Sequence, residues 1–203
     1  LIQVNPKADV WQRDKQEACV KDVRTVDAEV TGTPVQLYEY TTLLKDSYVE
    51  AAWYALGAIA ILVFLHFRNI GSVILSLIPV AIGTIWMVGF MAYTGIPFNP
   101  ANIMTLPLVI GIGVTNGIHI LNRFAEEKNP GILGKSTGKA VLVSGLTTVA
   151  GFGSLIMAKH QGIASLGYVM AVGTATCMIA ALTFLPAFLN LMGSGLKEKS
   201  TAP

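Results

Sequence analysis

The sequence predicts an all-α membrane protein with five transmembrane helices, preceded by a β-α-β remnant of a larger soluble α+β domain. Two observations carry this prediction. Of the 203 residues, 53% are apolar and 13% are charged, against roughly a quarter charged in soluble domains, and the mean hydropathy is +0.59. Asp, Glu, Lys and Arg are absent from Ala51 to Phe67 and again from Asn69 to Asn122.

Residues 1–47 are the polar part of the chain, and acidic residues outnumber basic ones there. LIQVN predicts a strand, residues 10–26 predict a helix that Asp9 caps, and AEVTGTPVQLYEY predicts strands around a Gly-Thr-Pro turn. Such a segment is too short to bury a core of its own. The chain opens at Leu1 without a signal peptide, and we expect it to be the C-terminal part of a longer protein.

Five apolar segments come next, the first continuing a helix that we expect to begin near Thr41. Each is long enough to cross a hydrocarbon core of about 30 Å at about 1.5 Å per residue. They cover residues 50–67, 72–93, 101–122, 139–158 and 163–192. The expected parts are therefore the end of a soluble domain (1–47), a transmembrane bundle (48–193) and a tail (194–203).

The basic residues between the spans predict the orientation, because an excess of Lys and Arg marks the cytoplasmic side. With five spans, residues 1–47 and the tail lie on opposite sides of the membrane. Lys159 is the one basic residue in the short loops opposite the tail. Seven lie on the side of the tail: Arg68, Arg123, Lys128, Lys135, Lys139, Lys197 and Lys199. We therefore expect a cytoplasmic tail and, in a Gram-negative cell, periplasmic residues 1–47.

Polar side chains interrupt the third and fourth spans. In the third, Thr115 and Asn116 lie four and three residues before His119, so the three share one face. In the fourth, similar spacings place three hydroxyl side chains on one face: Ser144, Thr147 and Thr148. Hydroxyl groups in membrane helices often bond only to their own backbone, whereas an intramembrane histidine is a functional candidate by default. Both interpretations stay open, and the depths of the two faces allow them to meet.

Glycines accompany these polar residues. Small residues four apart let neighbouring membrane helices approach closely, and this is the spacing of Gly113 and Gly117. Gly111 lies just before them, and the fourth span contains Gly145 and Gly151. We expect all five to support close helix packing, with the third span inside the bundle.

Other classes of chemistry leave no pattern in the sequence. It contains no phosphate-binding Gly-Lys loop, no HExxH and no nucleophile elbow. Cys19 and Cys177 have no metal-ligand spacing, and a disulfide between a polar segment and an apolar span is not expected. The scattered basic residues predict no nucleic-acid partner. We expect neither an enzyme nor a bound cofactor.

Several motifs together resemble one family. The turn GIPFNPANI, the span LPLVIGIGVTNGIHILNRF and the segment SGLTTVAGFGSL are similar to the C-terminal end of resistance–nodulation–division (RND) transporters. The similarity is to the branch with the mycobacterial membrane protein large (MMPL) transporters and the hopanoid transporters. It implies twelve membrane helices in two halves, a periplasmic porter-like domain in each half, and proton-driven export of hydrophobic lipids. The implied partners are the N-terminal half, the lipid and the bacterial inner membrane, with a homo-oligomer left open.

The sequence departs from the family pattern at one position. Many relatives place Asp after GIGV, where this chain has Thr115 followed by Asn116. Neither side chain titrates, so the resemblance implies that an acid on the matching helix of the N-terminal half carries the proton. The polar residues of the third and fourth spans would then be its partners, with His119 passing protons to cytoplasmic water. The alternatives are an uncoupled lipid-sensing or assembly module, or an auxiliary factor for protein export.

Overall fold

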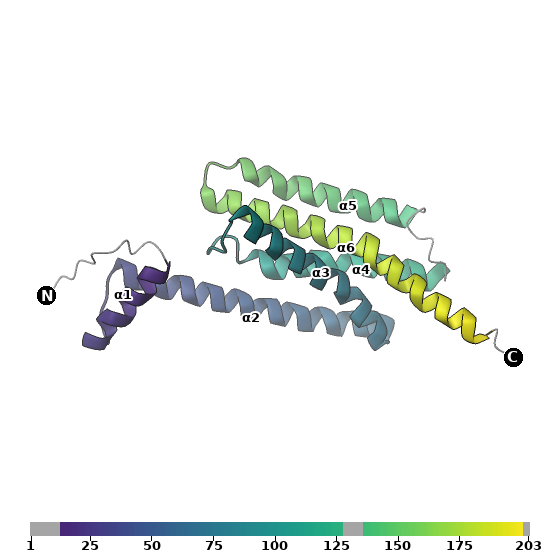
Figure 1. The fold of residues 1–203 in the computed structure, drawn as a ribbon, viewed down its shortest axis with the longest axis horizontal. Helices are drawn as coiled ribbons and strands as arrows, with labels where there is room; N and C mark the ends of the chain where they lie inside the picture. Colours follow the sequence, from purple (N-terminus) through teal and green to yellow (C-terminus); the bar gives the residue numbers. More distant parts are fainter. Residues whose placement is uncertain (1–12, 128–135, 201–203) are drawn as a thin grey trace. The chain divides into compact units, whose positions relative to one another are not determined.

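The computed structural model describes residues 13–127 and 136–200, and nearly all of them are helical (Figure 1). The chain divides into two compact units, residues 1–47 and 48–203, and one helix crosses from the first into the second. The elements in order are α1 (Arg13–Val26), α2 (Thr33–Phe67), α3 (Ile70–Thr94), α4 (Thr105–Glu127), α5 (Ser136–Gly153), the 3-10 turn η2 (Ser154–Met157) and α6 (Gln161–Ser200).

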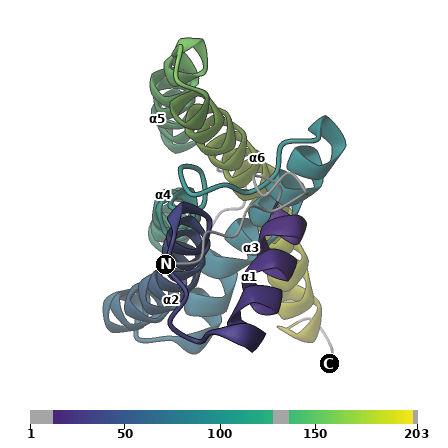
Figure 2. The ribbon, with the colours of Figure 1, turned by 90° about the vertical axis from the view of Figure 1, so that its left-hand side faces the viewer.

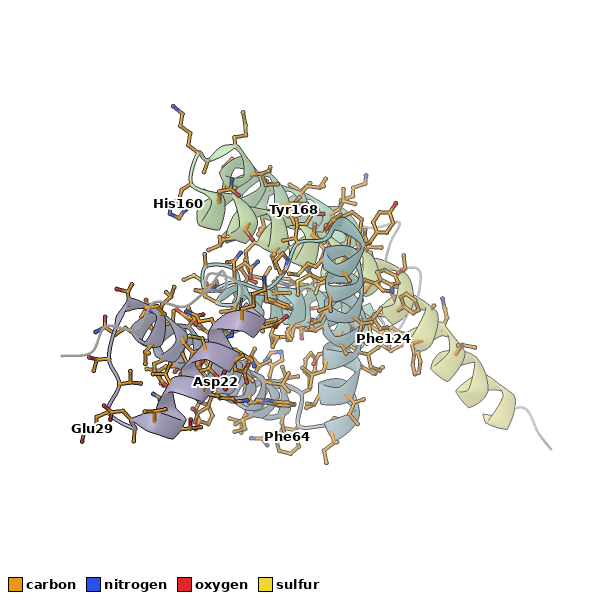
Figure 3. All side chains as sticks on the ribbon, turned by 60° about the vertical axis from the view of Figure 1, so that its left-hand side comes forward. Asp22, Glu29, Phe64, Phe124, His160 and Tyr168 are labelled. Carbon is orange, nitrogen blue, oxygen red and sulfur yellow. The ribbon has the colours of Figure 1, made fainter. Side chains whose placement is uncertain are left out.

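In the first unit, α1 packs against the first turns of α2. Val20 of α1 is buried, with 2% of its surface exposed, and Arg24 forms an ion pair of 2.7 Å with Glu39 of α2. Asp22 of α1 and Glu29 of the α1–α2 connection are exposed (Figure 3). The other buried residue of α1 is the polar Gln16, whose Nε2 donates to the carbonyl of Pro34 at 2.9 Å. The location of this unit outside the membrane stays a prediction.

The predicted strands at AEVTGTPVQLYEY are wrong, because the described residues contain no strand and α2 already begins at Thr33. Pro34 lies in the first turn of α2, where its missing N–H costs nothing. The N–H of Gln36 donates to the carbonyl of Gly32 at 2.9 Å. Since no helix-breaking residue separates this turn from the apolar run, the helix propagates into it. The predicted strand LIQVN lies outside the described residues, so the β-α-β remnant is not supported.

Five of the described helices are long and apolar enough to cross a membrane, which agrees with the predicted all-α membrane fold. Their apolar spans are Thr33–Phe67, Ile70–Thr94, Thr105–Glu126, Gly138–Met157 and Gln161–Leu191. The third span was predicted to start at residue 101 but starts at Thr105, because residues 101–104 form turns instead of helix. The last helix, α6, continues through the predicted boundary at residue 193 to Ser200.

The bundle is arranged around α6, against which α3, α4 and α5 all pack. Figures 1 and 2 show α5 lying along α6 in both views. Fully buried side chains of α6 include Met170 and Leu185, and they meet Met87 of α3 and Ile120 of α4 in two apolar clusters. The most central helix therefore also supplies the largest share of the core.

Two turns determine how the helices enter and leave the bundle. In the α3–α4 connection, Asn102 is fully buried and its amide donates to Ser165 Oγ of α6 at 2.7 Å and to the carbonyl of Pro97 at 3.0 Å. In the α2–α3 connection, Asn69 caps α3 by accepting from the N–H of Gly71 at 2.8 Å. We call the end of the bundle at the α3–α4 connection the Asn102 end. We call the opposite end, at the α2–α3 connection, the Asn122 end, because Asn122 of α4 contacts His66 at the end of α2 there.

Candidate functional site

The helix α4 has two different faces. Gly113 and Gly117 are buried against α6 and α3: an added Cβ would lie 3.1 Å from Cys177 Sγ at Gly113 and 3.0 Å from the Ser76 carbonyl at Gly117. Thr115 and His119, one turn apart, are exposed on another side of the helix. The described chain therefore leaves a polar strip of α4 uncovered, within a span that is mostly apolar.

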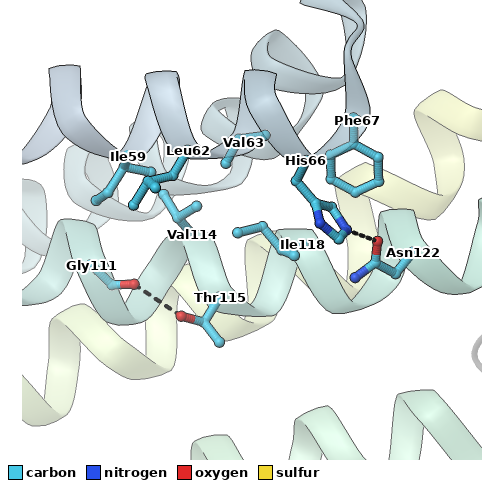
Figure 4. A pocket seen from close by; sticks show the side chains of 10 residues that line it. All are labelled: Ile59, Leu62, Val63, His66, Phe67, Gly111, Val114, Thr115, Ile118 and Asn122. Carbon is cyan, nitrogen blue, oxygen red and sulfur yellow. Dashed lines mark hydrogen bonds between the residues drawn. The ribbon is translucent and has the colours of Figure 1, made fainter.

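Thr115 uses its hydroxyl on its own helix. Its Oγ1 donates to the carbonyl of Gly111 at 3.1 Å (Figure 4). Gly111 itself has open space around it, because a Cβ added there would meet nothing within 4 Å. A hydroxyl bonded only to a carbonyl one turn back keeps both lone pairs and can rotate to another acceptor. The uncovered side of Thr115 is thus available to a polar group from outside the described chain.

Asn116 is on the buried side of α4, with 6% of its surface exposed. Its Nδ2 has no hydrogen-bond partner among the described residues. A buried amide without a partner costs about 1–3 kcal/mol, so it needs an explanation. It does not share the exposed side of Thr115 and His119, and the predicted single patch of three residues is therefore split between two environments.

The hydroxyl residues of α5 bond within their own helix. Thr147 and Thr148 donate to the carbonyl of Ser144 at 2.8 and 2.9 Å. Ser144 and Thr147 are exposed, and Thr148 is half-buried. Within the described residues, no hydrogen bond links these three side chains to the polar residues of α4. A meeting of the two faces stays a prediction, and the geometry shows the backbone-bonding arrangement.

The structure places the predicted packing glycines in two groups. Gly145, like Gly113 and Gly117, is tight, since its added Cβ would overlap Met178 of α6, whereas Gly111 and Gly151 have open surroundings. Sequence reasoning missed a crossing at which the backbones themselves are close, where a Cβ on Gly83 of α3 would lie 2.5 Å from Cys177 Cα. The one available signal was the small-residue run GTATC of α6 at residues 173–177.

A second feature that the sequence did not reveal is a cleft of about 320 Å³ between α2 and α4 (Figure 4). At its polar end His66 Nε2 lies 2.9 Å from Asn122 Oδ1. This contact joins α2 to α4 through two residues that are 56 positions apart in the sequence. The sequence places His66 at a loop border with no visible partner. The cleft is lined by Ile59, Leu62, Val63, His66, Phe67, Gly111, Val114, Thr115, Ile118 and Asn122.

Metal or thiol chemistry finds no support in the described residues. They contain no group of three or more His, Cys, Asp or Glu side chains that could hold a metal ion. Cys19 and Cys177 are both free. The chemistry that the site offers is hydrogen bonding by hydroxyl, amide and imidazole groups inside an apolar bundle.

Comparison with known proteins identifies the family. The sequence model of the MMPL family matches residues 7–202. A protein of Methanocaldococcus jannaschii named only as a membrane protein is 36% identical over 172 residues, which cover 81% of this chain and 44% of that protein. The hopanoid transporter of Rhodopseudomonas palustris is 30% identical over 189 residues, 93% of this chain and 22% of the transporter.

A more distant relative has a different named cargo. The trehalose monomycolate exporter of Mycolicibacterium smegmatis is 24% identical over 206 residues, 90% of this chain and 20% of the exporter. The chain thus spans less than half the length of each of these relatives. The match over nearly the whole chain confirms the resemblance drawn from its motifs, and the chain belongs to the MMPL family.

Proposed function

We propose that the chain is the C-terminal part of a proton-driven RND-type exporter of hydrophobic lipids, with hopanoids as one candidate cargo. The relatives named as hopanoid and trehalose monomycolate transporters support lipid export. The observation that carries the proposal is the uncovered polar strip of α4, formed by Thr115 and His119 within an apolar helix. Such residues within a membrane face a protein interior or a water-filled pathway.

Proton coupling in this proposal needs a carboxylate from another part of the transporter. Thr115 and Asn116 do not titrate, but both donate hydrogen bonds. A carboxylate that packs against α4 would accept from Thr115 Oγ1, which now donates to Gly111. That bond favours the ionised carboxylate and weakens when the carboxylate takes up a proton, because the charge that strengthens it is removed. Protonation would thus loosen the contact with α4, and His119, one turn nearer the Asn122 end, would exchange protons with water.

The orientation in this proposal rests on the positive-inside rule. The Asn122 end, with Arg68 and Arg123 beside it, would face the cytoplasm, and residues 1–47 would lie in the periplasm of a bacterial inner membrane. The N-terminal half of the same transporter would supply the partner helices. A homo-oligomer is compatible with this arrangement.

One observation favours a second candidate, a lipid-sensing or assembly module of the same fold that does not move protons. The family position that often holds Asp is here Thr115, followed by Asn116, so this chain contributes no titrating group there. If no carboxylate elsewhere replaces it, the bundle would respond to lipid without proton transport. Proton flux therefore separates the two candidates.

The test uses the full-length protein reconstituted in proteoliposomes. A pH-sensitive dye inside the vesicles measures proton flux, and a labelled lipid measures export. We expect Thr115→Val to reduce proton flux and lipid export together by roughly ten-fold or more, since a hydrogen bond to a charged group contributes about 1.5–3 kcal/mol. Thr115→Ser should keep both activities. The matched control is Thr183→Val on α6, whose hydroxyl also donates one turn back, to Ile179 at 2.7 Å.

The outcomes separate the candidates. Full proton-driven export by a Thr115→Val, Thr148→Val double variant would contradict the assigned roles. Absence of proton flux in the unmodified protein, with lipid still bound, would favour the uncoupled module. If Thr183→Val lowered proton flux and lipid export as much as Thr115→Val, the effect would be common to hydroxyl side chains of the spans. The assignment of a specific role to Thr115 of α4 would then be wrong.

A further inference from the structure

The cleft between α2 and α4 has a long apolar part and one polar end. Its apolar lining comes from Ile59, Leu62 and Val63 of α2 and from Val114 and Ile118 of α4. Its volume of about 320 Å³ lies at the lower end of the roughly 300–1,000 Å³ usual for small-molecule sites. A narrow apolar space along two membrane helices has the form that a single hydrocarbon chain fills.

The polar end of the cleft is the Asn122 end, where His66 and Asn122 bond to each other. Residues of both charges occur near this end, since Glu126 and Glu127 close α4. Arg68 comes two positions after His66, and Arg123 comes directly after Asn122 and pairs with Glu126 at 3.1 Å. Glu126 balances Arg123, whereas Arg68 has no ion pair with the described residues, so Arg68 is the charge that complements an anionic group. The charge therefore indicates the kind of headgroup that would accompany a hydrocarbon chain in the cleft.

Arg68 has an unusual conformation. Its φ is +49°, the one positive φ of a non-glycine residue in the described chain. This left-handed conformation costs an L side chain free energy that glycine avoids. This conformation ends α2 as a left-handed cap, in which the Arg68 N–H donates to the carbonyl of Phe64 at 2.7 Å. The guanidinium is exposed and forms no ion pair or hydrogen bond with the described side chains. An exposed guanidinium without an acidic partner among the described residues can bind an anionic group from outside them.

We propose that this cleft binds one acyl chain of an anionic phospholipid from the adjacent membrane leaflet, with its phosphate on Arg68. Guanidinium groups bind phosphate oxygens in a two-pronged geometry. The chain would lie along Ile59 and Leu62 of α2 and Ile118 of α4 and reach the level of Thr115. The lipid would be a bound component of the bundle instead of the exported cargo, and the proposal does not depend on proton coupling.

The test maps lipid contacts in the full-length protein. It is reconstituted in phosphatidylcholine vesicles containing phosphatidylglycerol with a photoreactive diazirine in one acyl chain. After irradiation, mass spectrometry of the digested protein locates the adducts. We expect adducts in residues 59–67 and 111–118. The same diazirine on phosphatidylcholine should label these peptides several-fold less.

Two variants test the cleft and the charge separately. Gly111→Leu fills the cleft from a position where an added Cβ meets nothing, and it should abolish the adducts. Gly57→Leu on α2 is the matched control, since Gly57 is equally open but outside the lining. Arg68→Gly should lower phosphatidylglycerol labelling roughly five-fold, the effect of one basic residue near an anionic surface. It should also raise the melting temperature, so misfolding cannot explain the loss. Arg68→Lys should retain most of the labelling.

Three results would overturn the proposal. Equal labelling by the two phospholipids would mean that the cleft takes any membrane hydrocarbon. Unchanged adducts in Gly111→Leu would place the lipid elsewhere. Complete absence of adducts in the folded protein would mean that another helix of the transporter, or a second copy, fills the cleft.

Discussion

Replacing Gly83 by alanine tests the helix crossing on which the bundle is built. Gly83 of α3 lies against α6, and a Cβ there would be 2.5 Å from Cys177 Cα and 2.7 Å from Cys177 N. These are backbone atoms, which no rotamer change can move aside. Thr176 Oγ1 also donates to the carbonyl of Gly83 at 2.8 Å, so the same crossing carries a hydrogen bond between helices.

The expected cost of Gly83→Ala can be worked from this geometry. Ordinary contact with a Cβ needs 3.4 Å or more, so α3 and α6 must separate by roughly 1 Å in a close-packed interior. Overpacking of this kind costs about 1–3 kcal/mol, and separation weakens the Thr176 bond, worth about 1 kcal/mol. Alanine regains about 0.5–1 kcal/mol in helix propensity. The net expectation is a destabilisation of about 1–3 kcal/mol.

The assay is thermal unfolding of the purified protein in detergent, monitored by tryptophan fluorescence. The control is Gly89→Ala on the same helix, where an added Cβ meets nothing within 4 Å. That variant keeps the crossing and gains helix propensity, so its melting temperature should equal or exceed that of the unmodified protein. A melting temperature of Gly83→Ala at or above that of Gly89→Ala would refute the close approach of α3 and α6.

Three further substitutions make separate predictions. Asn102→Ala should destabilise the bundle by about 2–4 kcal/mol in the same thermal assay, because the carbonyl of Pro97 and the backbone N–H of Asn99 lose their buried partner. Asn116→Leu should stabilise the isolated bundle by about 1–3 kcal/mol by removing an unpaired amide. In the full-length transporter it should lower export, and unchanged export would contradict a functional amide. Gly145→Ala should cost less than Gly83→Ala, since the nearest atoms belong to the flexible Met178 side chain. An equal loss of melting temperature would show that Met178 cannot move.

The sequence predicted the five apolar helices well, because hydropathy and length alone define a membrane span. It failed where a local pattern fits both helix and strand. PVQLYEY alternates like a strand, yet the structure is helical from Thr33. The alternation is a local signal, whereas the long helix that continues from this segment into the apolar run favours helix throughout. The predicted helix boundaries also differ from the observed ones. The helix α4 starts at Thr105 and not at residue 101, because the turn at Asn102 precedes it.

The candidate site was predictable only in part. Intramembrane polar residues are visible in sequence, and Thr115, Asn116 and His119 stand out for that reason. Which of them is buried depends on the rotation of α4 against its neighbours, and Asn116 shares the buried side with Gly113. The His66 and Asn122 pair joins two helices without any local signal. The left-handed conformation of Arg68 is likewise invisible, because the identity of a residue does not determine its φ.

The two sides of α4 together constrain any movement that the bundle can make. On one side Gly113 and Gly117 hold α4 against α6 and α3, whose crossing at Gly83 leaves no space for sliding. On the other side Thr115 borders an open cleft toward α2. Packed helices shift between discrete arrangements as rigid bodies, so α3, α4 and α6 should move as one block. A change at Thr115 would then appear as a change in the α2–α4 cleft, and a lipid bound there, as proposed, would respond to the same event as the polar strip.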